Sequence, residues 1–237
     1  MGDYGFLGDR IEEVRIRVER AAERSGRDPG AVKILGVTKF HPLTAVQAAY
    51  DAGIRVFGEN RVQEALDKYP GFLARCPDAE VHMIGHLQGN KVKKAVTLFR
   101  CVQSGDSTDL LAELDRRAAA EGRRVDVLLE LHTGEESKSG FPDRRSALEA
   151  CDLLSGLRNL RMRGLMTMAP YTDDVSAIRS SFRSLRSLFE EISSARTFPA
   201  LDTLSMGMSN DFEIAVEEGA TLRSEERRVG KECRSRW

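Results

Sequence analysis

The sequence predicts an α/β fold: a single (β/α)8 TIM barrel preceded by an extra N-terminal helix. Strand-like apolar runs alternate with amphipathic helical stretches along most of the 237 residues, a pattern typical of parallel strands joined by crossover helices. The runs are almost continuously apolar, as in strands that are covered on both faces. Single barrels of about 250 residues are common, so the length fits one domain. An open doubly wound sheet is the alternative, but no Gly-x-Gly-x-x-Gly follows the first strand.

The first predicted element is a charged helix over residues 9–25, whose apolar stripe has helical spacing and consists of Ile11, Val14, Val18, Ala21 and Ala22. The glycine- and proline-containing stretch 26–30 ends it. Short apolar runs then predict strands at residues 33–38, 54–57, 81–84, 101–103, 125–131, 160–164 (running into 165–166), 203–204 and from 221 onward. Stretches with helical periodicity, several closed by glycine, predict helices at 43–52, 62–73, 91–99, 109–121, 146–154, 176–194 and 211–217.

Composition and charge exclude several classes of function. The formal net charge is -1, so no overall field attracts nucleic acid or an anionic membrane. No apolar stretch approaches the roughly 20 residues that span a bilayer, and the N-terminus lacks the features of a signal peptide. The four cysteines form no Cys-x-x-Cys, which indicates reduced thiols in a cytoplasmic protein, and the four histidines show no metal-ligand spacing. We therefore expect a cytoplasmic protein without a metal site.

Lys39 ends the apolar run 32–37, after Thr38, and precedes Phe40-His41-Pro42. This position places it in the loop at the C-terminal end of the first strand, where TIM barrels carry their chemistry. A lysine there can form an imine with an aldehyde or a ketone. A solvated lysine in a turn is the simpler interpretation, and the remaining loops decide between the two.

The loops after the other predicted strands are also polar, and they should meet at the same end of the barrel. Individually they have simple explanations: Glu59 and Asn60 can cap the following helix, and glycines can permit turns. The loop 205–209 is small, contains glycine and precedes a predicted helix, which favours a bound phosphate. An imine-forming lysine opposite a phosphate loop is the minimum equipment for binding pyridoxal phosphate (PLP).

Five stretches between residues 33 and 222 carry a family resemblance: LGVTKFHP, FGENRVQE, HMIGHLQGNK, GLMTMAP and LSMGMSNDFEIAVEEGAT. Together they resemble the pyridoxal phosphate homeostasis proteins, small single-barrel relatives of alanine racemase. The resemblance implies an internal aldimine of PLP on Lys39 and the following further cofactor-binding residues: Asn60 beside the cofactor, Ser205 and Ser209 on its ring and phosphate side, and His82 and Met166 lining the barrel near the ring. It also implies a carrier or buffer of PLP with no established turnover. We expect a monomer or weak dimer that serves PLP-dependent apoenzymes.

Two other functions fit an imine-forming lysine in this fold. A PLP-dependent amino-acid racemase would need a second acid–base residue opposite Lys39, and the candidates are His41, His82 and Tyr171. An aldolase acting on a phosphorylated sugar would place its lysine near carboxylates on a later strand. Neither alternative is excluded by the sequence.

The C-terminal stretch 223–237 departs from the family pattern. In that pattern a strand resembling Val-Arg-Ile-Gly-Thr follows the Gly-Ala-Thr run, and its arginine faces the pyridine nitrogen. Here the stretch is highly charged and contains the only tryptophan, so we expect that it cannot be a buried strand, and that the first and seventh strands expose unpaired edges. The pyridine-facing arginine would then be absent, or displaced to Arg223.

The same stretch resembles the in-frame translation of a sequencing-library adapter. The sequence therefore predicts a PLP-binding barrel at 1–222 with a truncated eighth strand, and a non-family tail at 223–237 that is an assembly artefact. A genuine basic tail that binds nucleic acid is the alternative.

Overall fold

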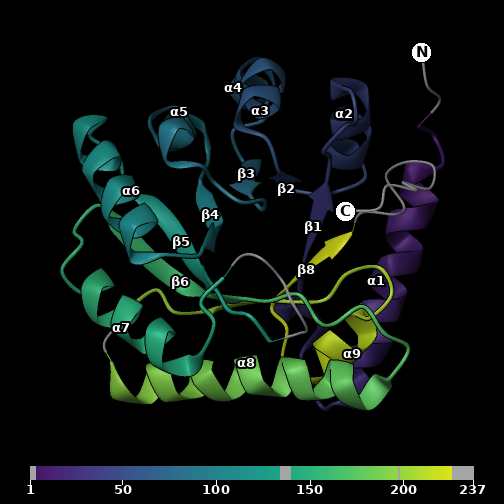
Figure 1. Cartoon of the computed structure of the whole chain (residues 1–237). Helices are drawn as coiled ribbons and strands as arrows, with labels where there is room; N and C mark the ends of the chain where they lie inside the picture. Colours follow the sequence, from purple (N-terminus) through teal and green to yellow (C-terminus); the bar gives the residue numbers. More distant parts are fainter. Residues whose placement is uncertain (1–3, 134–139, 197, 226–237) are drawn as a thin grey trace.

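The protein is a closed barrel of eight parallel strands in sequential order, with helices arranged around it (Figure 1). The computed structural model describes residues 4–133, 140–196 and 198–225. The strands are β1 (Lys33–Val37), β2 (Val56–Glu59), β3 (Glu80–Met83), β4 (Cys101–Gly105), β5 (Val125–Glu130), β6 (Leu160–Met166), β7 (Thr203–Ser205) and β8 (Leu222–Glu225). The closed barrel confirms the predicted fold class and contradicts the open sheet.

The helices are α1 (Leu7–Arg24), α2 (Leu43–Asp51), α3 (Val62–Lys68), α4 (Pro70–Arg75), α5 (Val92–Leu98), α6 (Thr108–Ala120), α7 (Arg144–Leu154), α8 (Val175–Ala195) and α9 (Phe212–Glu217), with 3-10 turns η1 (Pro29–Ala31) and η2 (Gly89–Lys91). The predicted apolar stripe of α1 is buried, as expected. In the described ranges no helix is both long and apolar enough to cross a bilayer.

The prediction of one helix over residues 62–73 is wrong, because two helices occupy this segment. α3 ends at Lys68 and α4 begins at Pro70. Proline has no N–H to continue the helical hydrogen bonds, so it suits the first position of a new helix and not the interior of a long one, although Tyr69 before it keeps helical backbone angles. The break leaves Lys68 at the end of α3, next to the C-terminal ends of β1 and β2.

Most of the apolar core lies between the strands and the surrounding helices. Two of the three smaller apolar clusters lie among the strands: one combines Leu35, Val37 and Leu222, and the other combines Cys101, Leu128 and Met166. Side chains alternate between the two faces of a strand, so these clusters fill the barrel interior. Apolar side chains therefore fill part of the barrel interior, whereas polar side chains lie at its C-terminal end.

Ion pairs stabilise the N-terminal end of the barrel. Asp126, the second residue of β5, accepts two hydrogen bonds from Arg161 of β6, at 2.6 and 2.7 Å, and a third from Arg163 at 3.1 Å. Asp126 is buried, and the two arginines are partly exposed. Residues at this face of a TIM barrel contribute to stability, not to chemistry.

The barrel is closed by β8, so the prediction of a missing eighth strand with exposed edges is wrong. β8 pairs with β1 over four residues, from Lys33↔Leu222 to Gly36↔Glu225, and with β7 at Ser205↔Leu222. Main-chain hydrogen bonds form whatever the side chains are, and closure removes two unpaired edges. The barrel therefore extends past the predicted boundary at residue 222. Residues 226–237 lie outside the described part, and their origin in an adapter stays a prediction.

The charged side chains of β8 lie in the layer between the strands and the helices. Arg223 is fully buried, and its guanidinium carbon lies 4.1 Å from the centre of the Phe212 ring in α9. Its Nη2 donates to Glu225 Oε2 at 2.7 Å, whereas Nε and Nη1 have no hydrogen-bond partner among the described residues. Each unsatisfied buried donor costs about 1–3 kcal/mol. β8 therefore closes the barrel at the energetic cost of two unsatisfied donors of Arg223.

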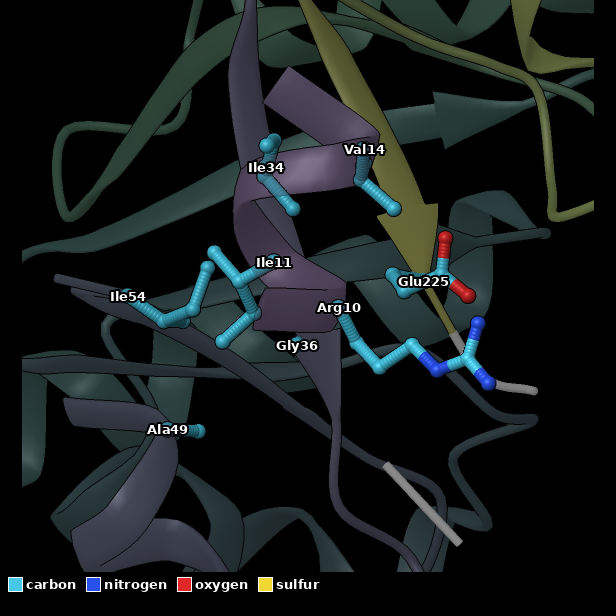
Figure 2. A pocket seen from close by; sticks show the side chains of 8 residues that line it. All are labelled: Arg10, Ile11, Val14, Ile34, Gly36, Ala49, Ile54 and Glu225. Atoms are coloured by element: carbon cyan, nitrogen blue, oxygen red, sulfur yellow. The ribbon is translucent and has the colours of Figure 1, made fainter. Parts of the chain in front are cut away.

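Glu225 adjoins a small cavity of about 10 Å³ between α1 and β1. Figure 2 shows its carboxylate at the end of β8, beside the side chain of Arg10, while the remaining lining is mostly aliphatic: Ile11, Val14, Ile34, Ala49 and Ile54. A buried carboxylate next to an aliphatic cavity occupies a place that suits an apolar side chain.

Candidate cofactor site

The six predicted site residues come from five different strands or the loops that follow them. Lys39 follows β1, Asn60 follows β2, and Ser209 lies in the loop between β7 and α9. His82 lies within β3, Met166 is the last residue of β6 and Ser205 is the last residue of β7. Since all eight strands are parallel, these positions lie at or near one end of the barrel. Lys39 is 9% exposed, so it is not the solvated lysine of the simpler interpretation.

Lys39 occupies a tight turn. The His41 N–H donates to the Thr38 carbonyl at 3.0 Å, which closes a turn with Lys39 and Phe40 at its centre. Phe40 has φ = 64°, and it is the one non-glycine residue with positive φ in the described ranges. A type II turn requires positive φ at this position, which is usually glycine or asparagine. The left-handed conformation costs phenylalanine roughly 1–2 kcal/mol, so other contacts must hold the turn.

A buried polar cluster lies directly behind this turn. Thr38 Oγ1 donates to Glu59 Oε1 at 2.7 Å and hydrogen-bonds to the Tyr69 hydroxyl at 2.6 Å. Lys68 Nζ donates to the same Glu59 oxygen at 2.8 Å. Glu59 is fully buried and makes no side-chain cap on α3, so its interpretation as a helix cap is wrong. The sequence contained one signal for this cluster, a carboxylate at the end of an apolar run.

Burial raises the pKa of the Glu59 carboxyl above its ordinary value of 4.5, and Lys68 and Thr38 oppose this shift. A raised pKa in the folded state means that the carboxyl contributes stability below its unfolded-state pKa, and that this contribution is lost as pH rises through the folded-state pKa. Burial likewise raises the pKa of Tyr69.

The Glu59→Gln variant tests this sign. Glutamine mimics the protonated carboxyl, so the free energy of unfolding of the variant minus that of the wild type should increase as pH rises from about 4.5 toward neutrality. Urea unfolding of both proteins at several pH values measures this difference. A difference that stays constant over the range, or decreases, would contradict the raised pKa.

A hydrogen-bonded chain crosses the barrel interior. Ser205 Oγ donates to Gln103 Oε1 at 2.7 Å, and Gln103 Nε2 lies 2.9 Å from His82 Nδ1. β4 and β7 are not neighbours in the barrel, so the contact between Ser205 and Gln103 passes through its interior. With Gln103 as the donor, His82 carries its proton on Nε2, which faces Glu80 Oε2 at 3.4 Å.

This chain links two predicted site residues, His82 and Ser205, through one that the sequence analysis missed. The only signal for Gln103 was a polar residue at the end of the short strand predicted at 101–103.

Asn60 presents an unsatisfied buried acceptor. Its Oδ1 is buried and has no hydrogen-bond partner among the described residues. A Cβ at Gly85 would lie 2.8 Å from the Cβ of Asn60, so only glycine at position 85 allows this close packing. A buried acceptor without a donor is costly, and a ligand donor at this position would remove the cost. The residues at the mouth therefore fit the cofactor that the sequence predicts.

Two backbone N–H groups of the predicted phosphate loop already have protein partners. The Met206 N–H donates to the Leu222 carbonyl at 3.1 Å, and the Met208 N–H donates to Asp211 Oδ1 at 2.6 Å. Gly207 has φ = 92°, and a Cβ there would lie 2.5 Å from the Cβ of Ala215. Glycine is therefore required at this position both by its backbone angle and by its packing.

The hydroxyl of Ser209 also has a protein partner, since it donates to Glu225 Oε1 at 3.0 Å. A phosphate that accepts a hydrogen bond from this hydroxyl has to displace the Glu225 carboxylate of β8.

Arg223 does not take the place of the pyridine-facing arginine. Leu222 belongs to the interior cluster, so the next side chain along β8 points outward, where Arg223 lies against Phe212. The suggestion that the arginine was displaced to position 223 is therefore wrong, because a shift of one residue along a strand moves a side chain to the other face.

The comparisons with known proteins define the class first. The sequence model described as alanine racemase, N-terminal domain, matches residues 11–231. An alanine racemase from Clostridium difficile 630 in complex with cycloserine has a TM-score of 0.71 at 12% identity over 93% of this chain and 60% of its own, a likeness of fold alone. The barrel and its polar mouth thus define an alanine-racemase-type barrel domain.

More similar proteins narrow the class to a family. A pyridoxal phosphate homeostasis protein from Aquifex aeolicus is 39% identical over 90% of this chain and 92% of its own, and a human protein of the same name is 37% identical over 91% and 82%. The structure of PipY from Synechococcus elongatus with PLP bound matches with a TM-score of 0.78 at 36% identity, covering 90% of this chain and 99% of PipY. The chain belongs to the family of pyridoxal phosphate homeostasis proteins.

Proposed function

We propose that this protein binds PLP through Lys39 and takes part in PLP homeostasis without catalysing a reaction of its own. The observation that supports the proposal is a nearly buried lysine after β1, with the unsatisfied Oδ1 of Asn60 after the neighbouring strand β2. A PLP-bound relative at 36% identity supports the same cofactor.

PLP supplies an electrophilic aldehyde and a phosphate. Lys39 would hold the cofactor through its amine, which can form an imine with that aldehyde with loss of water. Asn60 would orient the ring side, and the chain formed by His82, Gln103 and Ser205 would provide a polar wall. Met166, 7% exposed, would pack at the end of β6. Ser209 would serve the phosphate after release from Glu225.

The racemase alternative needs an acid–base residue, and its candidates are poorly suited. Tyr171 is 95% exposed and lies outside the helices and strands. Both ring nitrogens of His82 face polar partners, Gln103 and Glu80. His41 adjoins the Lys39 turn as the remaining candidate. The names of the relatives, which refer to homeostasis, support a binding protein over an enzyme.

The proposal includes a cytoplasmic monomer or weak dimer that exchanges PLP with apoenzymes. Three cysteines, Cys76, Cys101 and Cys151, are free and buried, which suits a reducing compartment. Burial raises the pKa of the Cys151 thiol to about 12, so this thiol stays protonated and unreactive.

The test is a visible absorption spectrum of the purified protein after addition of PLP, followed by borohydride reduction and peptide mapping. We expect an imine band and a reduced adduct on Lys39. An adduct with dihydroxyacetone phosphate but not with PLP would instead favour an aldolase. In heavy water, exchange of the α-proton of alanine or serine for deuterium, catalysed by the PLP-loaded protein, would favour the racemase.

A further inference from the structure

Two side chains of α3, Lys68 and Glu64, approach the turn that carries Lys39 from behind. Lys68 Nζ donates to the Thr38 carbonyl at 2.9 Å, and Glu64 Oε1 accepts the Phe40 N–H at 2.8 Å. The two contacts flank Lys39 in the sequence, one residue before and one after. They fix the main chain on both sides of Lys39 without using its side chain.

The two side chains also hold each other. Lys68 Nζ donates to Glu64 Oε1 at 2.9 Å and to Glu59 Oε1 at 2.8 Å. The Lys68 side chain is 8% exposed and that of Glu59 is fully buried, so both charges are largely removed from water. Buried charges of this kind require good geometry, which makes the position of Lys68 well defined.

We propose that Lys68 and Glu64 are positioning residues that hold the Lys39 turn in the conformation required for attachment of PLP. The inference rests on the proposed function, because it assigns a role toward the same lysine. The positive φ of Phe40 is the second observation: phenylalanine adopts it only where its surroundings impose it, and Glu64 accepts the N–H of that residue. The break between α3 and α4 at Pro70 places Lys68 at the helix end where it can reach Thr38.

Glu64→Ala tests the inference with little risk to the fold, because the Glu64 side chain is 25% exposed. In the cofactor-free protein, hydrogen exchange of the Phe40 amide should become about tenfold faster, since its acceptor is lost. The rate of PLP attachment, followed by borohydride trapping, should fall by a similar factor. Glu64→Gln retains a carbonyl acceptor and should restore most of both values. Gln63→Ala, one residue earlier on α3, is the matched control.

Lys68→Met provides a second arm, which should slow attachment in the same way if the variant folds. An unchanged attachment rate in a folded Glu64→Ala variant would overturn the positioning role, even if amide exchange accelerates. Equally slow attachment in Glu64→Gln would overturn it too, because the charge would then matter and not the hydrogen bond. If the wild-type protein attaches no PLP at all, the proposed function fails and the inference fails with it.

Discussion

Lys39→Ala is expected to abolish both the imine band and the borohydride-stable adduct completely, while the protein stays folded. The amine is the only group at this position that can form a C=N bond with the aldehyde, so its loss cannot be compensated by neighbouring contacts. The turn is held through the main chain of Thr38 and Phe40 and does not depend on the Lys39 side chain for these contacts. Weak, reversible binding through the phosphate should remain measurable by dialysis.

Lys33→Ala is the matched control for this experiment. Lys33 begins β1, and Lys39 follows its end, so the two lysines lie at opposite ends of the same strand. Six residues of extended chain separate them by roughly 20 Å. The control should retain the full adduct. An adduct that persists in Lys39→Ala and maps to another lysine would contradict the assigned site.

Replacement of both charged residues of β8, as Arg223→Met with Glu225→Leu, is expected to raise the free energy of unfolding by roughly 1–4 kcal/mol. The double variant removes two unsatisfied guanidinium donors and a carboxylate that adjoins an aliphatic cavity. The single variant Arg223→Met should instead lose about 3 kcal/mol, because it leaves Glu225 buried without its guanidinium partner. Urea unfolding of the wild type and the two variants measures both values.

The same double variant should also bind PLP more tightly. Leucine at position 225 cannot accept a hydrogen bond from the Ser209 hydroxyl, so that hydroxyl becomes available to a phosphate. The substitution also removes a nearby negative charge that would repel the phosphate. Equilibrium titration with PLP compares the variant with the wild type. Replacement of the strand by the family-type Val-Arg-Ile-Gly-Thr segment should tighten binding further, since it restores an inward-facing arginine. Unchanged affinity in both proteins would show that this strand is dispensable for the cofactor.

The local sequence alone determined the succession of strands and helices. Periodicity identified the α1 stripe, and the apolar run ending before Lys39 placed that lysine at the mouth of the barrel. Short-range signals were sufficient because each βα unit repeats the same pattern of burial. They failed at Pro70, because the helical spacing of apolar residues continues across the helix break that this proline marks.

Only the tertiary structure decided the partners of each polar group. The pairing of Glu59 with Lys68, the chain from Ser205 to His82 through Gln103, and the contact between Ser209 and Glu225 join residues far apart in the chain or on opposite sides of the barrel. The closure by β8 belongs here as well, because main-chain pairing with β1 outweighed an unfavourable side-chain composition. Hydrophobic periodicity reports which face a residue occupies, whereas hydrogen bonding depends on which other faces meet it, and that is set by the closed barrel.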